Sequence, residues 1–493
     1  RIHTNWTNTV QKVHDIALLD LRDGAKRDLL KACFTDPERL KPTETRQALT
    51  EKVAENFAAI AERLRKRGHN PQEVAHFVNR LVFCMFAEDV GLLPNNLFEA
   101  LIKNSRGAQG EKDFPKRAAN LFETMRKGGF YGNDEIDMFN GGLFENDATL
   151  PLTYQDLDDL YRITQPNWSD IDPSILGTLF ERGLDPDKRS QLGAHYTDRD
   201  KIMQIIQPVI IAPLLAEWAQ VRGQIEGLLP HDPAAAQSLR AGFAQRLADF
   251  RVLDPACGSG NFLYLSLIEL KNIEHRMNVE AESLGLPKAL PQIGPESVMG
   301  IELNPYAAEL ARVSVWIGEI QWMRRNGFEV AKKPILRTLD TIQNRDAVLN
   351  TDGTRADWPR ADVVVGNPPF LGNKKMIREL GEGYSVALRK AWGSVPGGAD
   401  LVCYWFAKAW EQMQAGHLTR AGLVATNSIR GGANREVLKP IVEGGQIFEA
   451  WSDEAWTVDG AAVRVSMVCF DGEKEGTAKL DGASVPEVFA DLS

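Results

Sequence analysis

The stretch Val252-Leu253-Asp254-Pro255-Ala256-Cys257-Gly258-Ser259-Gly260-Asn261-Phe262-Leu263 decides the fold. Its apolar start predicts a strand over Phe250–Leu253, and its glycines predict a tight turn that leads into a helix. Asp254 comes at the end of that strand, where open α/β sheets bind their ligands. Leu263 stands where a dinucleotide-binding turn would have its third glycine. The segment therefore favours a ligand with a charged amino-acid group over one with a pyrophosphate.

Four further β-rich runs follow this segment, and helical patterns lie between them. The runs are Ser297–Ile301, Asp362–Val365, Gly422–Thr426 and Val463–Phe470. Short apolar strands that alternate with helices predict an α/β fold, in which a mostly parallel sheet has helices on both faces. We assign this domain to residues 166–493.

Residues 1–165 have a different pattern, which predicts an all-α domain. Asn70-Pro71-Gln72-Glu73 is typical of a helix start, with a capping residue, a first-turn proline and an acid. Apolar residues then repeat at helical spacing from Val74 to Phe86, and Gly91 is a plausible end. The preceding stripe from Val53 to Leu64 predicts a second helix.

Composition and charge limit the classes of protein to which this chain can belong. The chain has 493 residues, 43% of them hydrophobic and 25% charged, and no run of 18 apolar residues, so we expect no membrane span. The odd number of scattered cysteines argues for reduced thiols, so we expect a cytoplasmic protein. Its five cysteines include no CxxC pair, so we expect no metal site. The net charge of −10 does not indicate a nucleic-acid binder, but local basic patches decide that property. Candidates are Arg63–Arg67, Lys332-Lys333 and Lys374-Lys375, and the alternative for each is a solvated surface.

Two acids follow later strands. Glu302, with Leu303 next to it, ends the second run and is placed to accept the hydroxyls of a ribose. The alternative is an ordinary acid at a helix N-terminus. Glu302 follows Asp254 by 48 residues, which predicts an insertion around 271–295. Asp346 follows a third strand region and is placed to accept the amine of a cofactor adenine, or is only a loop acid.

The turn Asn367-Pro368-Pro369-Phe370 ends the strand that contains three consecutive valines. Two prolines fix its backbone, so that the Asn367 side chain and the Pro368 carbonyl can both accept from one planar amine. Phe370 offers a flat face on which a flipped base can stack. The alternative is a cis-proline turn without chemistry.

These residues resemble motifs of the amino-methyltransferases. The turn that begins at Asp254 resembles motif I, and Glu302, Asp346 and Asn367–Phe370 resemble motifs II, III and IV. Upstream, Gly193–Asp198 resembles motif X, which gives the gamma-class order. The resemblance implies a Rossmann-like class I methyltransferase sheet with a closing antiparallel strand, S-adenosylmethionine as cofactor, and mostly adenine-N6 specificity.

The resemblance also implies roles for single residues. It places the following residues at the cofactor: Tyr196, Thr197, Asp254, Ala256, Gly258, Gly260, Phe262, Glu302, Leu303 and Asp346. It places Asn367, Pro368, Pro369 and Phe370 at the target base, and we expect Lys374 and Lys375 to contact a DNA phosphate.

The helical part narrows the resemblance further. Phe77–Asp89 is similar to the helical connector of the Type IIL (MmeI-like) restriction-modification enzymes, which implies double-stranded DNA as partner. We find no nuclease before this connector. Asp254, Glu269 and Lys271 spell a nuclease-like pattern, but they belong to the cofactor region. The chain ends about twenty residues after the last expected strand. We therefore expect the target-recognition domain and the nuclease on a longer protein or on separate subunits.

Other functions stay open from the sequence. Cytosine N4, RNA and a protein glutamine are alternative targets, because the same turn handles each of these amines. A scaffold with a relic catalytic half belongs to a different class, and the intact residues Asn367–Phe370 argue against it.

Overall fold

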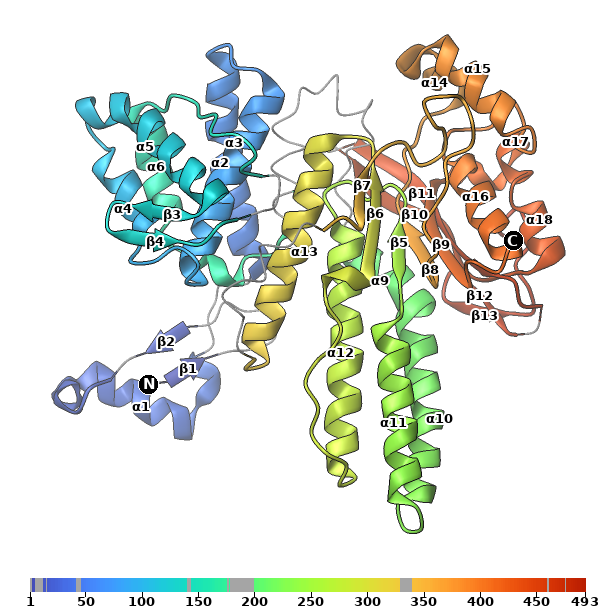
Figure 1. The fold of residues 1–493 in the computed structure, drawn as a ribbon, viewed down its shortest axis with the longest axis horizontal. Coiled ribbons are helices and arrows are strands. Elements are labelled where there is room, and N and C mark those ends of the chain that lie inside the picture. Colours follow the sequence, from blue (N-terminus) through green and yellow to red (C-terminus); the bar gives the residue numbers. More distant parts are fainter. Residues whose placement is uncertain are drawn as a thin grey trace. The chain divides into compact units, whose positions relative to one another are not determined.

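The computed structural model describes residues 2–4, 12–14, 16–40, 46–139, 143–174, 177, 199–328, 339–458, 461–474 and 476–493. The chain forms two compact units. The helical unit comprises Arg1–Asn140 and Phe144–Gly183, and the sheet unit comprises Gly141–Leu143 and Leu184–Ser493 (Figure 1). We describe each unit by itself.

The helical unit is mostly α-helical, as the sequence predicts, but it also contains two small hairpins that the sequence did not predict. Its helices are α1 (Gly24–Thr35), α2 (Arg46–Lys66), α3 (Pro71–Asp89), α4 (Leu97–Asn104), α5 (Ala108–Lys127) and α6 (Tyr154–Ile163). Two small hairpins accompany them, β1 (Ile2–Thr4) with β2 (Lys12–His14) and β3 (Gly129–Tyr131) with β4 (Asp134–Ile136). The Asn70 side chain accepts from Gln72 N at 2.9 Å at the start of α3, which confirms the predicted cap.

The basic cluster at the end of α2 is neutralised within this unit. Arg63 pairs with Asp156 at 2.6 Å and with Asp159 at 2.8 Å. Arg67 also pairs with Asp156, at 2.7 Å. These ion pairs favour the structural alternative for Arg63–Arg67 over a nucleic-acid patch. Lys332-Lys333 lies outside the described residues.

The sheet unit is built on nine strands in the order β13-β12-β10-β11-β9-β8-β5-β6-β7. The predicted strands are β5 (Val252–Asp254), β6 (Val298–Glu302), β8 (Val363–Gly366), β9 (Arg420–Thr426) and β11 (Ala461–Asp471), and β7 (Ile342–Asn344) fills the third strand region. β11 runs antiparallel to its neighbours β9 and β10, which confirms the closing antiparallel strand, and β13 runs antiparallel to β12.

Three strands of this sheet were not predicted: β10 (Gln446–Val458), β12 (Ala478–Leu480) and β13 (Ala483–Val485). The expectation that the last strand is Val463–Phe470 is therefore wrong. β12 and β13 have three residues each, which is too short for a periodic signal. β10 includes Glu449, Asp453 and Glu454, so it lacks the apolar run on which the prediction relied.

Helices cover both faces of this sheet, and alternate strand residues point to each. One layer contains α9 (Arg199–Ile206), α10 (Ala212–Leu228), α11 (Pro233–Ala248), α12 (Asn261–Ser283) and α13 (Pro305–Arg325) (Figure 1). The other contains α14 (Asn373–Leu380), α15 (Glu382–Ala391), α16 (Cys403–Gln414), α17 (Gly432–Arg435) and α18 (Lys439–Gly444). Val363 and Val365 join the first layer's core and Val364 the second, as the two-residue period of a strand requires.

Two features of the first helical layer matter for the predictions. The 48-residue spacing from Asp254 to Glu302 comes from the 23-residue helix α12 and the loop that follows it. The continuous helical run Arg199–Leu228 is long and apolar enough, by composition alone, to cross a membrane. Its Ile205 and Val209 side chains contact Gly422 of β9, so packing against the sheet accounts for part of this apolar character.

Candidate active site

The carboxyl ends of β5, β6, β7 and β8 lie along one edge of the sheet. The chain runs from β5 through β6 to β7 on one side, and then returns to place β8 on the other side of β5. Ligands bind at such a change of direction in open α/β sheets. The residues that end β5 and β8 are Asp254 and Gly366, so both predicted turns start at this point.

Asp254 and Gly366 lie against each other. A Cβ atom on Gly366 would lie 2.5 Å from Asp254 Oδ1, so only glycine fits beside this carboxylate. The parallel pairing of β5 with β8, through Val252 with Val363, fixes this arrangement. The structure therefore brings the glycine turn and the Asn-Pro-Pro-Phe turn together, and Gly366 is a site residue that the sequence did not single out.

The glycine turn after β5 has two glycines with different tasks. Gly258 has a φ of +52°, and nothing lies within 4 Å of where its Cβ would be. Gly260 has a φ of +87°, and its Cβ would lie 2.8 Å from Ala311 Cα in α13. Gly258 therefore leaves space for a ligand, while Gly260 permits two helices to pack closely. Phe262 is buried in α12 and belongs to the same apolar core as Ala311.

Asp254 is almost inaccessible, with 1% of its surface exposed. It accepts from Ala256 N at 3.0 Å, which orients the turn. Burial raises the pKa of Asp254 to about 8, with the Glu302 charge adding to the shift against the effect of the Ala256 hydrogen bond. Because burial disfavours the charged carboxylate, a cationic group next to Asp254 would stabilise its ionised form.

Glu302 connects the two loops at this edge. Its carboxylate accepts from Gly258 N at 2.9 Å and from Asn304 N at 2.8 Å. Asn304, not Glu302, caps α13, because its side chain accepts from Tyr306 N at 3.0 Å. Burial raises the pKa of Glu302. The neighbouring Leu303 is 61% exposed, which leaves an apolar surface beside this half-buried acid.

Asp346 follows β7 and has several partners. Its Oδ1 accepts from Val348 N at 2.8 Å and from Leu349 N at 3.1 Å. Its Oδ2 accepts from the Tyr384 hydroxyl at 2.8 Å. Asp346 therefore organises its own loop, which agrees with the alternative that it is a loop acid. Its contact with a cofactor adenine stays a prediction.

The turn after β8 places its four residues at different depths. Pro368 is buried, whereas Asn367, Pro369 and Phe370 are half-buried. Phe370 packs against the apolar core that includes Phe262. No cis peptide bond occurs among the described residues, so the alternative of a cis-proline turn is wrong. Lys374 and Lys375 are exposed in the first turn of α14, just beyond this turn.

Some predicted residues are not brought to this edge by the described structure. Tyr196 and Thr197, with the whole segment Gly193–Asp198, lie outside the described residues. Lys271 is buried, and its ammonium donates to Ile293 O at 2.8 Å and to Glu319 at 2.9 Å. Its partners lie in the α12–α13 layer, so it contributes to packing there. Within the part of the chain that the structure describes, no group of three or more metal-ligating side chains occurs.

Tertiary contacts add residues that sequence reasoning missed. Trp405 of α16 donates to Pro255 O at 3.0 Å and so fixes the start of the glycine turn. Asp400 accepts from Asn373 N at 3.2 Å and from the Ser428 hydroxyl at 3.0 Å. Trp405 lies in a helix and Asp400 in a loop between helices, so neither follows a predicted strand, and no signal in the sequence indicated them.

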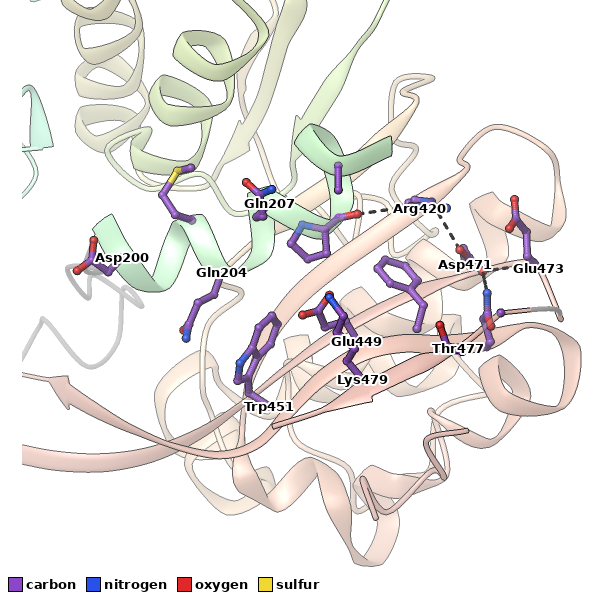
Figure 2. A pocket seen from close by; sticks show the side chains of 16 residues that line it. Asp200, Gln204, Gln207, Arg420, Glu449, Trp451, Asp471, Glu473, Thr477 and Lys479 are labelled. Atoms are coloured by element: carbon purple, nitrogen blue, oxygen red, sulfur yellow. Dashed lines mark hydrogen bonds and ion pairs between the residues drawn. The ribbon is translucent and has the colours of Figure 1, made fainter. Parts of the chain in front are cut away.

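A groove of about 760 Å³ lies on the same unit, where Gln204 and Gln207 face β9, β10 and β12 (Figure 2). Arg420 bridges it, with contacts of 3.5 Å to both Pro208 O and Asp471. Arg420 begins β9, whereas Thr426 ends it. The groove therefore extends from the opposite edge of the sheet and is separate from the candidate active site.

The comparisons with known proteins agree with this geometry. The family described as "MmeI, DNA-methyltransferase domain" matches residues 232–480, and the family "MmeI, helicase spacer domain" matches residues 72–144. "DNA methyltransferase A" of Bacillus subtilis (strain 168) is 29% identical over 451 residues, which are 85% of this chain and 48% of that protein. The chain thus spans about half the length of this curated relative.

A solved structure is similar over most of the chain. It is that of the Type IIL restriction-modification enzyme MmeI in complex with DNA, with a TM-score of 0.72 and 25% sequence identity. The match covers 90% of this chain and 61% of that one. The DNA in that structure is bound to MmeI. Since the methyltransferase-domain match covers about half of the residues and includes β5 to β11, the chain belongs to the MmeI DNA-methyltransferase-domain family.

Proposed function

We propose that this protein transfers the methyl group of S-adenosylmethionine to the exocyclic amine of a base flipped out of double-stranded DNA, with adenine N6 as the target. The contact of Asp254 with Gly366 carries the proposal, since it puts the two turns side by side. Family membership supports the same chemistry. We also propose a cytoplasmic restriction-modification or phage-defence role. In this role, residues 1–165 act as the helical connector and residues 166–493 act as the methyltransferase domain.

The residues after β5, β6 and β7 fit S-adenosylmethionine. The buried Asp254 suits its ammonium, and the open space at Gly258 suits close approach of the methionine chain. Glu302 would accept from the ribose hydroxyls, with the exposed Leu303 against the adenine and Asp346 accepting from its amine. Tyr196 and Thr197 are proposed to close the methionine end. When bound, this cofactor supplies an electrophilic methyl group.

The residues after β8 would orient the target. The Asn367 side-chain oxygen and the Pro368 carbonyl would accept the two N–H groups of the amine, which turns its lone pair toward the methyl group. Pro369 limits the backbone freedom of the turn, and Phe370 would stack on the flipped base. Lys374 and Lys375 are exposed and positively charged, so they suit a flanking phosphate. Positioning and electrostatics then provide most of the rate enhancement.

The test uses the full-length protein with tritiated S-adenosylmethionine and three acceptors: unmethylated double-stranded DNA, total RNA and total protein. We expect label in DNA, and N6-methyladenine after nucleoside analysis. Single-molecule methylation mapping of DNA from expressing cells would then give the modified sequence. N4-methylcytosine would replace the adenine assignment, and label only in RNA or protein would overturn the DNA proposal.

Asn367→Ala separates the target turn from the cofactor site. We expect the variant to bind S-adenosylhomocysteine like the wild type and to lose at least a hundredfold in kcat, as removal of one preorganised polar group typically costs about that much. Asn120→Ala, at an exposed position of α5 in the helical unit, is the matched control. Near wild-type turnover of Asn367→Ala would remove Asn367 from the mechanism.

A further inference from the structure

Helix α15 contacts two loops that belong to different halves of the proposed site. The Tyr384 hydroxyl donates to Asp346 Oδ2 at 2.8 Å, in the loop after β7. Trp392, which follows the helix, donates to Val348 O in the same loop at 2.9 Å. The Arg389 guanidinium donates to the side-chain oxygen of Asn373, six residues after Asn367. One rigid helix is thus bonded to the cofactor-adenine loop and to the exit of the target turn.

The Tyr384 hydrogen bond orients the Asp346 carboxylate and leaves it able to accept a further hydrogen bond. Asp346 Oδ1 already accepts from two backbone amides, so Tyr384 determines the direction of Oδ2. A carboxylate offers about four acceptor positions, so Oδ2 retains capacity for a second donor such as the adenine amine. Burial, with the nearby Asp346 charge, raises the pKa of Tyr384 well above its usual range, so the hydroxyl remains a donor at neutral pH.

The Asn373 contact lies on a short and stiff path to the reacting amine. Asn373 N donates to Asp400 at 3.2 Å, and Leu401 N donates to Leu371 O at 2.9 Å. The segment that leaves the target turn is therefore held on both sides. Between it and Asn367 lie Pro368 and Pro369, whose fixed φ angles restrict the backbone, and Gly372, whose two neighbours are held by the hydrogen bonds just described. A shift of α15 would consequently reach Asn367.

We propose that α15 couples the cofactor-adenine loop to the orientation of Asn367, so that Tyr384 and Asn373 are positioning residues for methyl transfer. The proposal rests on the proposed function. A cofactor that fixes Asp346 also fixes Tyr384, α15 and Asn373, and this restricts the target turn before the base arrives. Linkage makes the effect reciprocal: a bound target base must tighten cofactor binding by the same factor.

The experiment compares Tyr384→Phe, Asn373→Ala and the double variant in the full-length protein. Calorimetry with S-adenosylhomocysteine, with and without duplex DNA that contains the mapped sequence, gives cofactor affinity. Steady-state methylation gives kcat at saturating cofactor. Tyr154→Phe, on the exposed first turn of α6 in the helical unit, is the matched control.

We expect each single variant to change both quantities. Tyr384→Phe should weaken S-adenosylhomocysteine by about threefold to tenfold, as expected for one lost hydrogen bond, and also lower kcat. Asn373→Ala should lower kcat and reduce the gain in cofactor affinity that DNA produces. The double variant should be no worse than the worse single variant, since both break the same connection. If Tyr384→Phe changes only affinity, Asn373→Ala changes only kcat, and the effects add, the coupling is refuted.

Failure of the proposed function would be visible separately. Hydrogen exchange of the amides at 371–377, with and without S-adenosylhomocysteine, needs no methyl transfer. We expect the compound to protect these amides in the wild type and in Tyr154→Phe, but not in Tyr384→Phe. If the wild type shows this pattern and methylates no nucleic acid, the coupling stands and the proposed function falls. Equal protection in all variants would overturn the coupling alone.

Discussion

The Glu302 carboxylate accepts a hydrogen bond from Gly258 N at 2.9 Å, so the acid that ends β6 holds the turn that follows β5. The same carboxylate accepts from Asn304 N at 2.8 Å. An acid that only interacted with the dipole of α13 would not need to reach across to the neighbouring strand. Glu302 therefore shapes the glycine turn, and its contact with a ribose stays a prediction.

Replacement of Glu302 by alanine should weaken cofactor binding. The variant loses the acceptor for two backbone amides, and hydrogen bonds to charged groups contribute about 1.5–3 kcal/mol each. We expect S-adenosylhomocysteine affinity, measured by calorimetry, to fall at least tenfold. Glu302→Gln keeps one acceptor oxygen and should show a smaller loss. Unchanged affinity in Glu302→Ala would support the helix-dipole explanation for this acid.

Gly366→Ala should disturb both turns at once. The added methyl carbon would lie 2.5 Å from Asp254 Oδ1, so β8 or the carboxylate must move. Such overpacking typically costs about 1–3 kcal/mol of stability. We expect lower S-adenosylhomocysteine affinity together with lower kcat, because the shift affects both sites. Gly242→Ala, at an exposed position of α11, is the control, since nothing lies within 4 Å of its added methyl carbon. If Gly366→Ala behaves like Gly242→Ala, the contact between Asp254 and Gly366 has no role in function.

The sequence predicted the site residues that follow a recognisable strand, and it missed those whose role depends on contacts between distant segments. Asp254, Glu302 and Asn367 each follow an apolar run, so strand position alone placed them at one edge. The role of Gly366 depends on which strand neighbours β5, which periodicity does not encode. Tyr384 lies 38 residues beyond its partner Asp346, and no local pattern connects the two. β10 was missed because its acidic residues interrupt the apolar run.

Cofactor binding should release a proton because of Asp254. Burial raises the pKa of this carboxyl to about 8, against roughly 3.9 in an unfolded chain. The folded state thus holds the proton more tightly, so the contribution of Asp254 to stability is present below about pH 4 and is lost as pH rises through 8. An incoming ammonium favours the ionised form and expels the proton. Calorimetry at pH 7 in buffers of different ionisation enthalpy should show this release in the wild type and not in Asp254→Asn. A binding enthalpy independent of the buffer would contradict the assignment.

Glu88 gives the helical unit a pH dependence of its own. Its carboxylate accepts from Phe98 N at 2.5 Å and from Glu99 N at 3.2 Å, at the start of α4. Burial raises the pKa of Glu88 to about 7, with the Asp89 and Glu99 charges adding to the shift against these two hydrogen bonds. The folded state therefore binds this proton more tightly than the unfolded chain, whose glutamates titrate near 4.3. Its stabilising contribution is complete below that value and declines as pH rises to 7.

Hydrogen exchange of the α4 amides, corrected for the intrinsic pH dependence of exchange, measures this effect in the full chain. We expect protection to fall between pH 5 and pH 8 in the wild type. Glu88→Gln keeps an acceptor oxygen but carries no charge, so its protection should stay constant and exceed that of the wild type at pH 8. Glu111→Gln, in the first turn of α5, is the control for loss of an acid near a helix start and should keep the wild-type slope. If Glu88→Gln retains that slope, the titrating group is another one, and the burial of Glu88 does not govern the stability of α4.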